Sequence, residues 1–125
     1  MKIVQTSHAP AAIGPYSQAI SIGNLVYTSG QIPCDPVTGA ITGSDIATQA
    51  KQSLENVKHV LEAAGTCCEN VVKTTCFLHD MADFAAFNEI YAQYFTGRPA
   101  RSCFAVKALP KGALCEVEAI AVITE

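Results

Sequence analysis

Charged residues are scarce in this sequence, and no stretch of it is rich in lysine or arginine. Charged side chains make up 15 % of the 125 residues, whereas an average soluble protein has about 25 %. Eight basic and eleven acidic residues give a net charge of −3, which argues against binding to nucleic acid through phosphate neutralisation. A small globule with so little charge is expected to cover part of its surface with copies of itself.

Long apolar runs are also missing. No run approaches the ~18–20 residues that span a bilayer, so we expect no membrane segment. Residues 1–6 lack the apolar stretch of a signal peptide, which predicts a cytoplasmic protein. The length fits a single domain over residues 1–125.

Several chemical motifs are absent as well. The six cysteines include no CxxC pair, and without an export signal they are expected to be reduced thiols. The neighbours Cys67 and Cys68 follow a predicted helix end, and their role stays open. The three histidines show no metal-ligand spacing, so we expect no metal site. Neither a glycine-rich phosphate loop nor a serine or cysteine triad can be found.

What remains is a pattern of strands and two helices. The pattern predicts paired strands over 18–22 and 25–29, joined by Gly23-Asn24, a strong signal for a tight hairpin. Apolar residues spaced by three and four predict a helix over 45–64, with Ser44 as N-cap and Gly65 at its end. The rest of the chain predicts a strand over 71–78, a helix capped by Asp80 or Asp83, and two strands over 101–107 and 114–124. The order predicts an α+β two-layer sandwich, a mixed β-sheet with both helices on one face. The last two strands are expected to pair in antiparallel fashion across their short link.

Arg101 and Glu116 are the strongest candidates for chemistry. If Phe104 and Val106 point into the core beneath the helices, strand alternation places both Arg101 and Glu116 on the other face. A guanidinium there can clamp a carboxylate ligand with two hydrogen bonds, and a nearby carboxylate can take a proton from water. The alternative is an ordinary cross-strand salt bridge between the two side chains.

Two loops could wall a pocket. Residues 9–16 carry two prolines and a glycine before Tyr16, which makes a stiff connection. Ser29 and Gly30 follow an apolar strand, and a glycine there permits close approach of the backbone to a ligand. Both segments also suit plain structural roles, as a strand connector and a strand-ending turn.

Six short motifs in a fixed order carry a resemblance. They are residues 16–18 (YSQ), 29–33 (SGQIP), 72–75 (VKTT), 87–91 (FNEIY), 99–103 (PARSC) and 115–121 (CEVEAIA). With them the chain resembles, over essentially its whole length, the RidA (YjgF-type) family of 2-iminobutanoate/2-iminopropanoate (enamine/imine) deaminases.

The resemblance implies a fold, an assembly and a reaction. The implied fold is chorismate-mutase-like, and the implied assembly is a homotrimer with sites in the clefts between subunits. The implied reaction is hydrolysis of reactive 2-enamino and 2-imino acids, such as 2-aminoacrylate, to 2-keto acids and ammonia, with no cofactor. Pyridoxal-phosphate-dependent serine/threonine dehydratases, which form these imines, are the implied functional partners.

The resemblance also implies residue roles. Arg101 matches the residue that binds the substrate carboxylate, and Glu116 matches the acid that positions the attacking water. Cys103 matches a residue whose main chain meets the nitrogen end of the ligand. The pocket wall corresponds to Tyr16, Ser29, Gly30 and Asn88.

Two other functions compete with deamination. One is a trimeric small-carboxylate-binding or chaperone-like module, which keeps Arg101 but does not need the carboxylate of Glu116. The other is RNA cleavage, an activity associated with this family, which the acidic charge balance disfavours.

Overall fold

The computed structural model describes residues 1–124 of the chain. Three 3₁₀ turns, at Cys68–Asn70, Met81–Asp83 and Pro110–Gly112, lie between the longer elements. The longer elements are β1 (Lys2–Val4), β2 (Ala19–Ile22), β3 (Leu25–Thr28), α1 (Ile46–Ala63), β4 (Val71–Leu78), α2 (Phe84–Tyr94), β5 (Ala100–Ala105) and β6 (Cys115–Val122). None of the helices among these residues is both long and apolar enough to cross a membrane.

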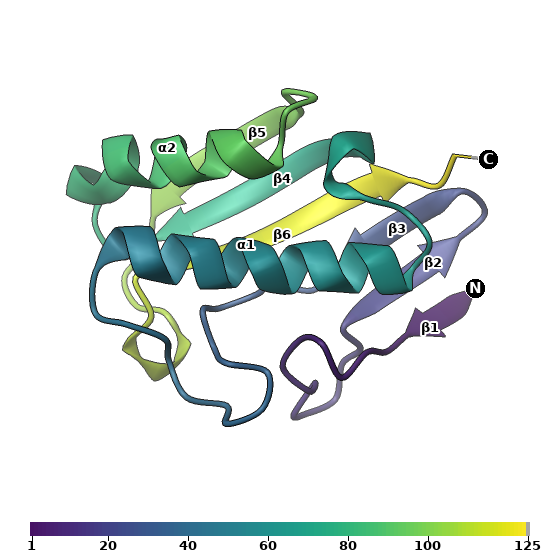
Figure 1. The fold of residues 1–125 in the computed structure, drawn as a ribbon, viewed down its shortest axis with the longest axis horizontal. Helices are drawn as coiled ribbons and strands as arrows, with labels where there is room; N and C mark the ends of the chain where they lie inside the picture. Colours follow the sequence, from purple (N-terminus) through teal and green to yellow (C-terminus); the bar gives the residue numbers. More distant parts are fainter. Residues whose placement is uncertain (125) are drawn as a thin grey trace.

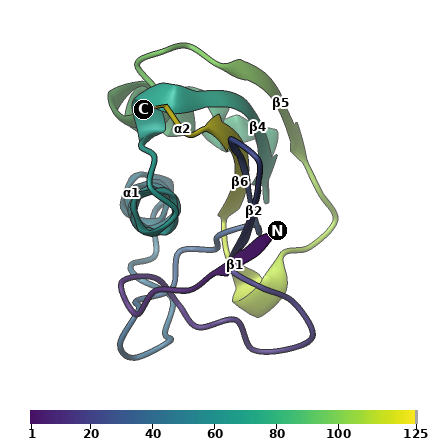
Figure 2. The ribbon, with the colours of Figure 1, turned by 90° about the vertical axis from the view of Figure 1, so that its right-hand side faces the viewer.

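The elements form two layers. Both helices lie side by side on one face of a curved sheet, and no helix covers the other face (Figures 1 and 2). This arrangement confirms the expected α+β sandwich. We call the uncovered side of the sheet the open face.

The sheet has six strands in the order β1-β2-β3-β6-β4-β5. All neighbours pair in antiparallel fashion except β4 and β5, which are parallel. The expected antiparallel pair of the last two strands is therefore wrong, because β4 lies between them. Helix α2 carries the chain from the end of β4 back to its start, so β5 must run parallel to β4.

The link between β5 and β6 passes around the end of β4 instead of forming a hairpin. Val106 N donates to Leu78 O at 2.9 Å, and His79 N donates to Leu114 O at 2.9 Å. These two hydrogen bonds hold both ends of the link against the last residues of β4. A short link between two strands favours a hairpin, but here the α2 crossover places β5 at the edge of the sheet beside β4.

Local turn and cap signals mostly agree with the structure. The β2–β3 hairpin turns at Gly23, whose φ is +57°. Helix α1 ends before Gly65, whose φ of +90° suits glycine. Its N-cap is Asp45 and not Ser44, because the Asp45 carboxylate accepts from Thr48 N at 3.0 Å. This hydrogen bond also lowers the pKa of Asp45.

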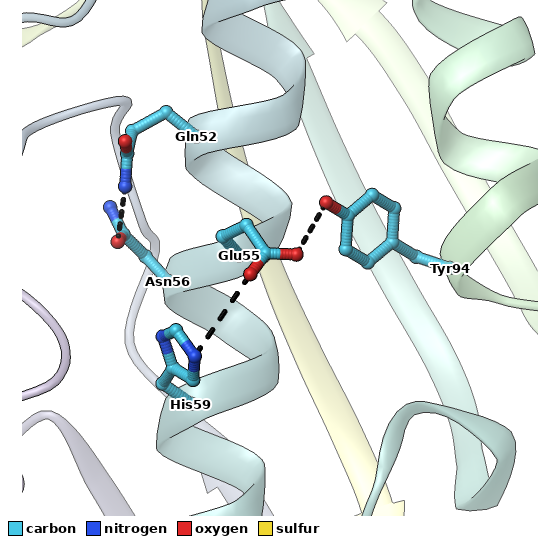
Figure 3. A network of polar contacts seen from close by, with 5 residues as sticks. All are labelled: Gln52, Glu55, Asn56, His59 and Tyr94. Atoms are coloured by element: carbon cyan, nitrogen blue, oxygen red, sulfur yellow. Dashed lines mark hydrogen bonds and ion pairs between the residues drawn. The ribbon is translucent and has the colours of Figure 1, made fainter.

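Strand β6 is the centre of the sheet and alternates as expected. Cys115, Val117 and Ala121 are fully buried under the helices, against a core that includes Leu54 and Phe87. The other residues of β6 point to the open face: Glu116, Glu118, Ile120 and Val122. The helices are also tied to each other, because Tyr94 Oη of α2 donates to Glu55 Oε2 of α1 at 2.6 Å (Figure 3).

Candidate functional site

Arg101 is held on an aromatic platform under helix α2. Its guanidinium carbon lies 4.7 Å from the ring centre of Tyr91 and 5.4 Å from that of Phe84. Its Nη1 donates to Asn88 Oδ1 at 2.7 Å. Cation–π contact and one charge-assisted hydrogen bond therefore fix the guanidinium, while its remaining N–H groups are available for a ligand.

The platform itself is rigid. Tyr91 Oη shares a 2.7 Å hydrogen bond with Thr74 Oγ1, and Thr74 is fully buried. Burial raises the pKa of Tyr91, so the ring stays neutral and keeps its hydroxyl proton. Among residues 1–124 the only contact within 4.0 Å between an acidic and a basic side chain joins Glu55 to His59, which leaves Arg101 without a carboxylate partner.

Glu116 projects from the open face of β6 and packs against a glycine. A Cβ atom built on Gly30 would collide with Glu116 Oε2, so only glycine lets the backbone approach the carboxylate so closely. Burial, and second the neighbouring charge of Glu118, raise the pKa of Glu116. A carboxyl group with a raised pKa is a better proton acceptor and donor near neutral pH.

The two candidates lie on opposite faces of the sheet, so the expectation that they share a face is wrong. Arg101 is paired with Thr74 of β4, which points into the core. Phe104 is paired with Phe77, their rings are 5.4 Å apart, and Phe77 is in turn paired with Glu116 on the open face. Phe104 is 45 % exposed and does not belong to the core, which is why the alternation was read in the wrong phase.

The other expected pocket residues divide between two cavities. A cavity of about 580 Å³ beside α2 is lined by Asn88, Tyr91, Arg98 and Arg101. A second cavity, of about 530 Å³, is lined by Tyr16, Gly30, Gln31 and Lys111, among others. The arginine and asparagine thus line one cavity, and the tyrosine and glycine line the other. Glu116 packs against Gly30 but is not among the residues that line either cavity.

Ser29 and Cys103 line neither of these two cavities, and neither offers a reactive side chain. Ser29 Oγ donates to Ser17 O at 2.5 Å and so ties the strand end to the stiff loop. Cys103 is half-buried, and burial raises the pKa of its thiol. All six cysteines are free thiols.

One residue that shapes the site was missed. Gln18 is almost fully buried and ties down the stiff loop: its Nε2 donates to Thr6 O at 3.0 Å and Pro10 O at 2.8 Å, and its Oε1 accepts from Thr6 N at 2.7 Å. A polar residue opening an apolar strand is the signal that could have revealed it. Within the described chain no group of three or more His, Cys, Asp or Glu residues could hold a metal ion.

Fold and geometry together define a class: a two-layer α+β protein with a mixed six-stranded sheet, one open sheet face and two separate cavities. Comparisons with known proteins then identify the family. The sequence model described as endoribonuclease L-PSP matches residues 6–123. The 2-iminobutanoate/2-iminopropanoate deaminase of Salmonella typhimurium is 53 % identical over 125 residues, covering 97 % of each chain.

Solved structures agree with this match. Escherichia coli TdcF with bound serine has a TM-score of 0.94 and 48 % identity, covering 99 % of this chain and 100 % of the other. The yjgF gene product of Escherichia coli has a TM-score of 0.93 and 49 % identity, with the same coverage. The chain belongs to the endoribonuclease L-PSP (YjgF/RidA) family, and the resemblance stated from its motifs is confirmed.

Proposed function

We propose that this protein is a hydrolytic deaminase of reactive 2-enamino and 2-imino acids, including 2-iminopropanoate and 2-iminobutanoate. The observation that carries the proposal is the Arg101 guanidinium, which is oriented by Asn88 and two rings but has no carboxylate partner among the described residues. Such a group suits a small organic anion that arrives from solution. The deaminase name of the Salmonella typhimurium relative, at 53 % identity, supports the same chemistry.

The proposed reaction needs one anchor and one proton carrier. Arg101 binds the substrate carboxylate, and Glu116 takes a proton from a water molecule as the water oxygen bonds to the imine carbon. Glu116 returns that proton to the nitrogen, which gives a carbinolamine. It then transfers the hydroxyl proton of the carbinolamine to the nitrogen as the carbon–nitrogen bond breaks, so that the carbonyl of the 2-keto acid forms and ammonia leaves. Cys103 contributes its main chain at the nitrogen end, while Tyr16, Ser29 and Gly30 form the wall.

We infer that each site is completed between copies in a homotrimer. Within one chain Arg101 and Glu116 lie on opposite faces, so one small substrate cannot contact both. We call Arg101 with Asn88, and Glu116 with Gly30, the two half-sites. Arg101 lies on the edge strand β5, where the Glu116 half-site of a neighbouring copy can approach. The exposed apolar residues of the open face, Ile22, Tyr27 and Phe104, together with the low charge of the chain, support such an assembly.

The source of the substrate is part of the proposal. Imines of this kind are released by pyridoxal-phosphate-dependent serine/threonine dehydratases, and we place the protein beside them in the cytoplasm. The direct test is to follow 2-keto acid formation by a threonine dehydratase while semicarbazide traps the free imine. Added protein is expected to divert the imine from semicarbazone to 2-keto acid, and failure to do so overturns the proposal.

A small-carboxylate-binding module is the second candidate, because the related TdcF structure contains bound serine. Glu116→Gln separates the two functions, since it keeps the size of the side chain but cannot accept the proton. A deaminase loses roughly 10²–10³-fold in kcat and still binds a 2-keto acid. A binding module shows no turnover in either form and the same affinity for the 2-keto acid.

A further inference from the structure

Helix α1 buries a stripe of polar side chains beside its apolar stripe. Gln49 is 4 % exposed, and Ser53 and Asn56 are fully buried. Their spacing of four and three places them on one side of the helix. Buried polar groups are costly unless they are hydrogen-bonded, so their partners indicate what the stripe does.

Two of the three residues hold the segment that follows Gly30. The Ser53 hydroxyl donates to Gln31 O, and Asn56 Nδ2 donates to Ile32 O at 3.1 Å and Cys34 O at 2.9 Å. Asn56 is itself oriented, because its Oδ1 accepts from Gln52 Nε2 at 2.9 Å (Figure 3). We call residues 31–34 the anchored segment.

Gln49 holds the other side of the same half-site. Its Oε1 accepts from Leu114 N at 2.8 Å, directly before β6, and its Nε2 donates to Gly43 O at 3.0 Å. The anchored segment also contacts β6, since Gln31 N donates to Val117 O at 2.8 Å and Val117 N to Gln31 O at 3.2 Å. The stripe therefore fixes the backbone on both sides of the contact between Gly30 and Glu116.

We propose that Gln49, Ser53 and Asn56 are positioning residues for the Glu116 carboxylate. They hold Gly30 and the start of β6 so that the carboxylate keeps one place and stays shielded from water. This inference rests on the proposed function for its kinetic consequence, but not for its effect on the carboxylate itself.

The environment of Glu116 makes the effect measurable. Burial is the larger of the two causes that raise the pKa of Glu116, and the charge of Glu118 on the same strand is the second. The neighbouring strand contributes Phe77 and the segment before Gln31 contributes Gly30, neither of which carries a charge. Loss of the anchors admits water, which lowers the pKa of Glu116 toward the ordinary glutamate value of about 4.3.

The test compares Ser53→Ala and Asn56→Ala with Val60→Ala, a control on the same helix. Val60 is fully buried, and its apolar side chain cannot donate a hydrogen bond to the anchored segment. The pKa of Glu116 is measured in each variant by ¹³C NMR titration of the labelled carboxyl, together with the urea midpoint of unfolding. We expect all three to be less stable, and only Ser53→Ala and Asn56→Ala to lower the Glu116 pKa.

Kinetics supply the second readout. Because Glu116 acts as a base only when it is deprotonated, a lower pKa moves the acid limb of the kcat profile to lower pH. We expect that shift together with a roughly tenfold lower kcat and a KM changed less than about twofold. An unchanged Glu116 pKa in both variants, with stability losses like that of Val60→Ala, overturns the positioning role. If the wild-type protein has no deaminase activity, the proposed function fails while the NMR comparison still decides this inference.

Discussion

The two half-sites of this chain are held in different ways. Side chains hold Arg101: two rings lie against its guanidinium and an amide accepts from one nitrogen. Backbone holds Glu116: a glycine packs on the carboxylate, and buried groups of α1 fix that glycine's neighbours. The first arrangement suits a group that binds, because its free N–H groups keep a fixed direction. The second suits a group that exchanges protons, because shielding from water sets its pKa.

Removal of the guanidinium gives the largest expected effect. Arg101→Ala deletes the carboxylate anchor, and we expect kcat/KM on 2-iminobutanoate to fall roughly 10³-fold. Arg101→Lys keeps the charge but loses the two-pronged geometry, so it should recover only part of this loss. The semicarbazide competition assay measures both. Equal activity of Arg101→Ala and the wild type contradicts the binding role of this half-site.

A single methyl group tests the backbone-held half. In Gly30→Ala the new Cβ must displace the Glu116 carboxylate, whose flexible end gives way before the fold does. We expect a 10- to 100-fold lower kcat, estimated from the general-base contribution, with little change in KM. Steady-state kinetics and the urea midpoint are the measurements. A wild-type kcat in a folded Gly30→Ala protein shows that this contact has no part in the reaction.

The aromatic platform should matter less and act on binding. Tyr91→Leu keeps an apolar side chain but removes the cation–π contact and the hydrogen bond to Thr74. We expect KM to rise about three- to tenfold with a smaller change in kcat, because the guanidinium loses its fixed direction. The control is Phe87→Leu on the same helix, because the fully buried Phe87 ring packs against Tyr91 while the rings that lie against the Arg101 guanidinium are those of Phe84 and Tyr91. A similar KM increase in both variants points to general loosening of α2.

The smallest effect is expected outside both half-sites. Tyr94→Phe removes the hydrogen bond from Tyr94 to Glu55 that joins the helices (Figure 3). It should lower the free energy of unfolding by about 1–2 kcal/mol, because the bond is to a charged acceptor but lies partly in solvent. Kinetic constants should equal those of the wild type. Urea denaturation and the coupled assay check these two statements, and a kcat loss here means that the half-sites are not independent of helix packing.

Much of the fold follows from local patterns. The Gly23-Asn24 turn, the three- and four-residue spacing of α1 and the alternation of β6 each determine a local conformation, and the structure has all of them. Strand order is different, because the place of β5 depends on a helix crossover between distant residues. A short link between two strands gives no information about a third strand that lies between them.

The phase of β5 was misread for a related reason. Phe104 was assigned to the core because it is large and apolar, yet it lies on the open face with Phe77. Apolar residues that await another copy of the chain look in sequence like those buried within it. The buried positions of Gln49, Ser53 and Asn56 on α1 could not be predicted either, since polar residues on a helix are ordinarily assigned to its exposed side.

The account depends on one site being shared by two copies, and mixed trimers test this directly. Arg101→Ala and Glu116→Gln are co-expressed with different tags, and complexes that contain both chains are isolated by two affinity steps. Each parent is expected to be nearly inactive alone, whereas every ring of three that contains both chains has one wild-type site, about a third of the full number. Recovered activity in the mixed complexes supports a site made of Arg101 from one copy and Glu116 from the next. Mixed complexes as inactive as their parents contradict it.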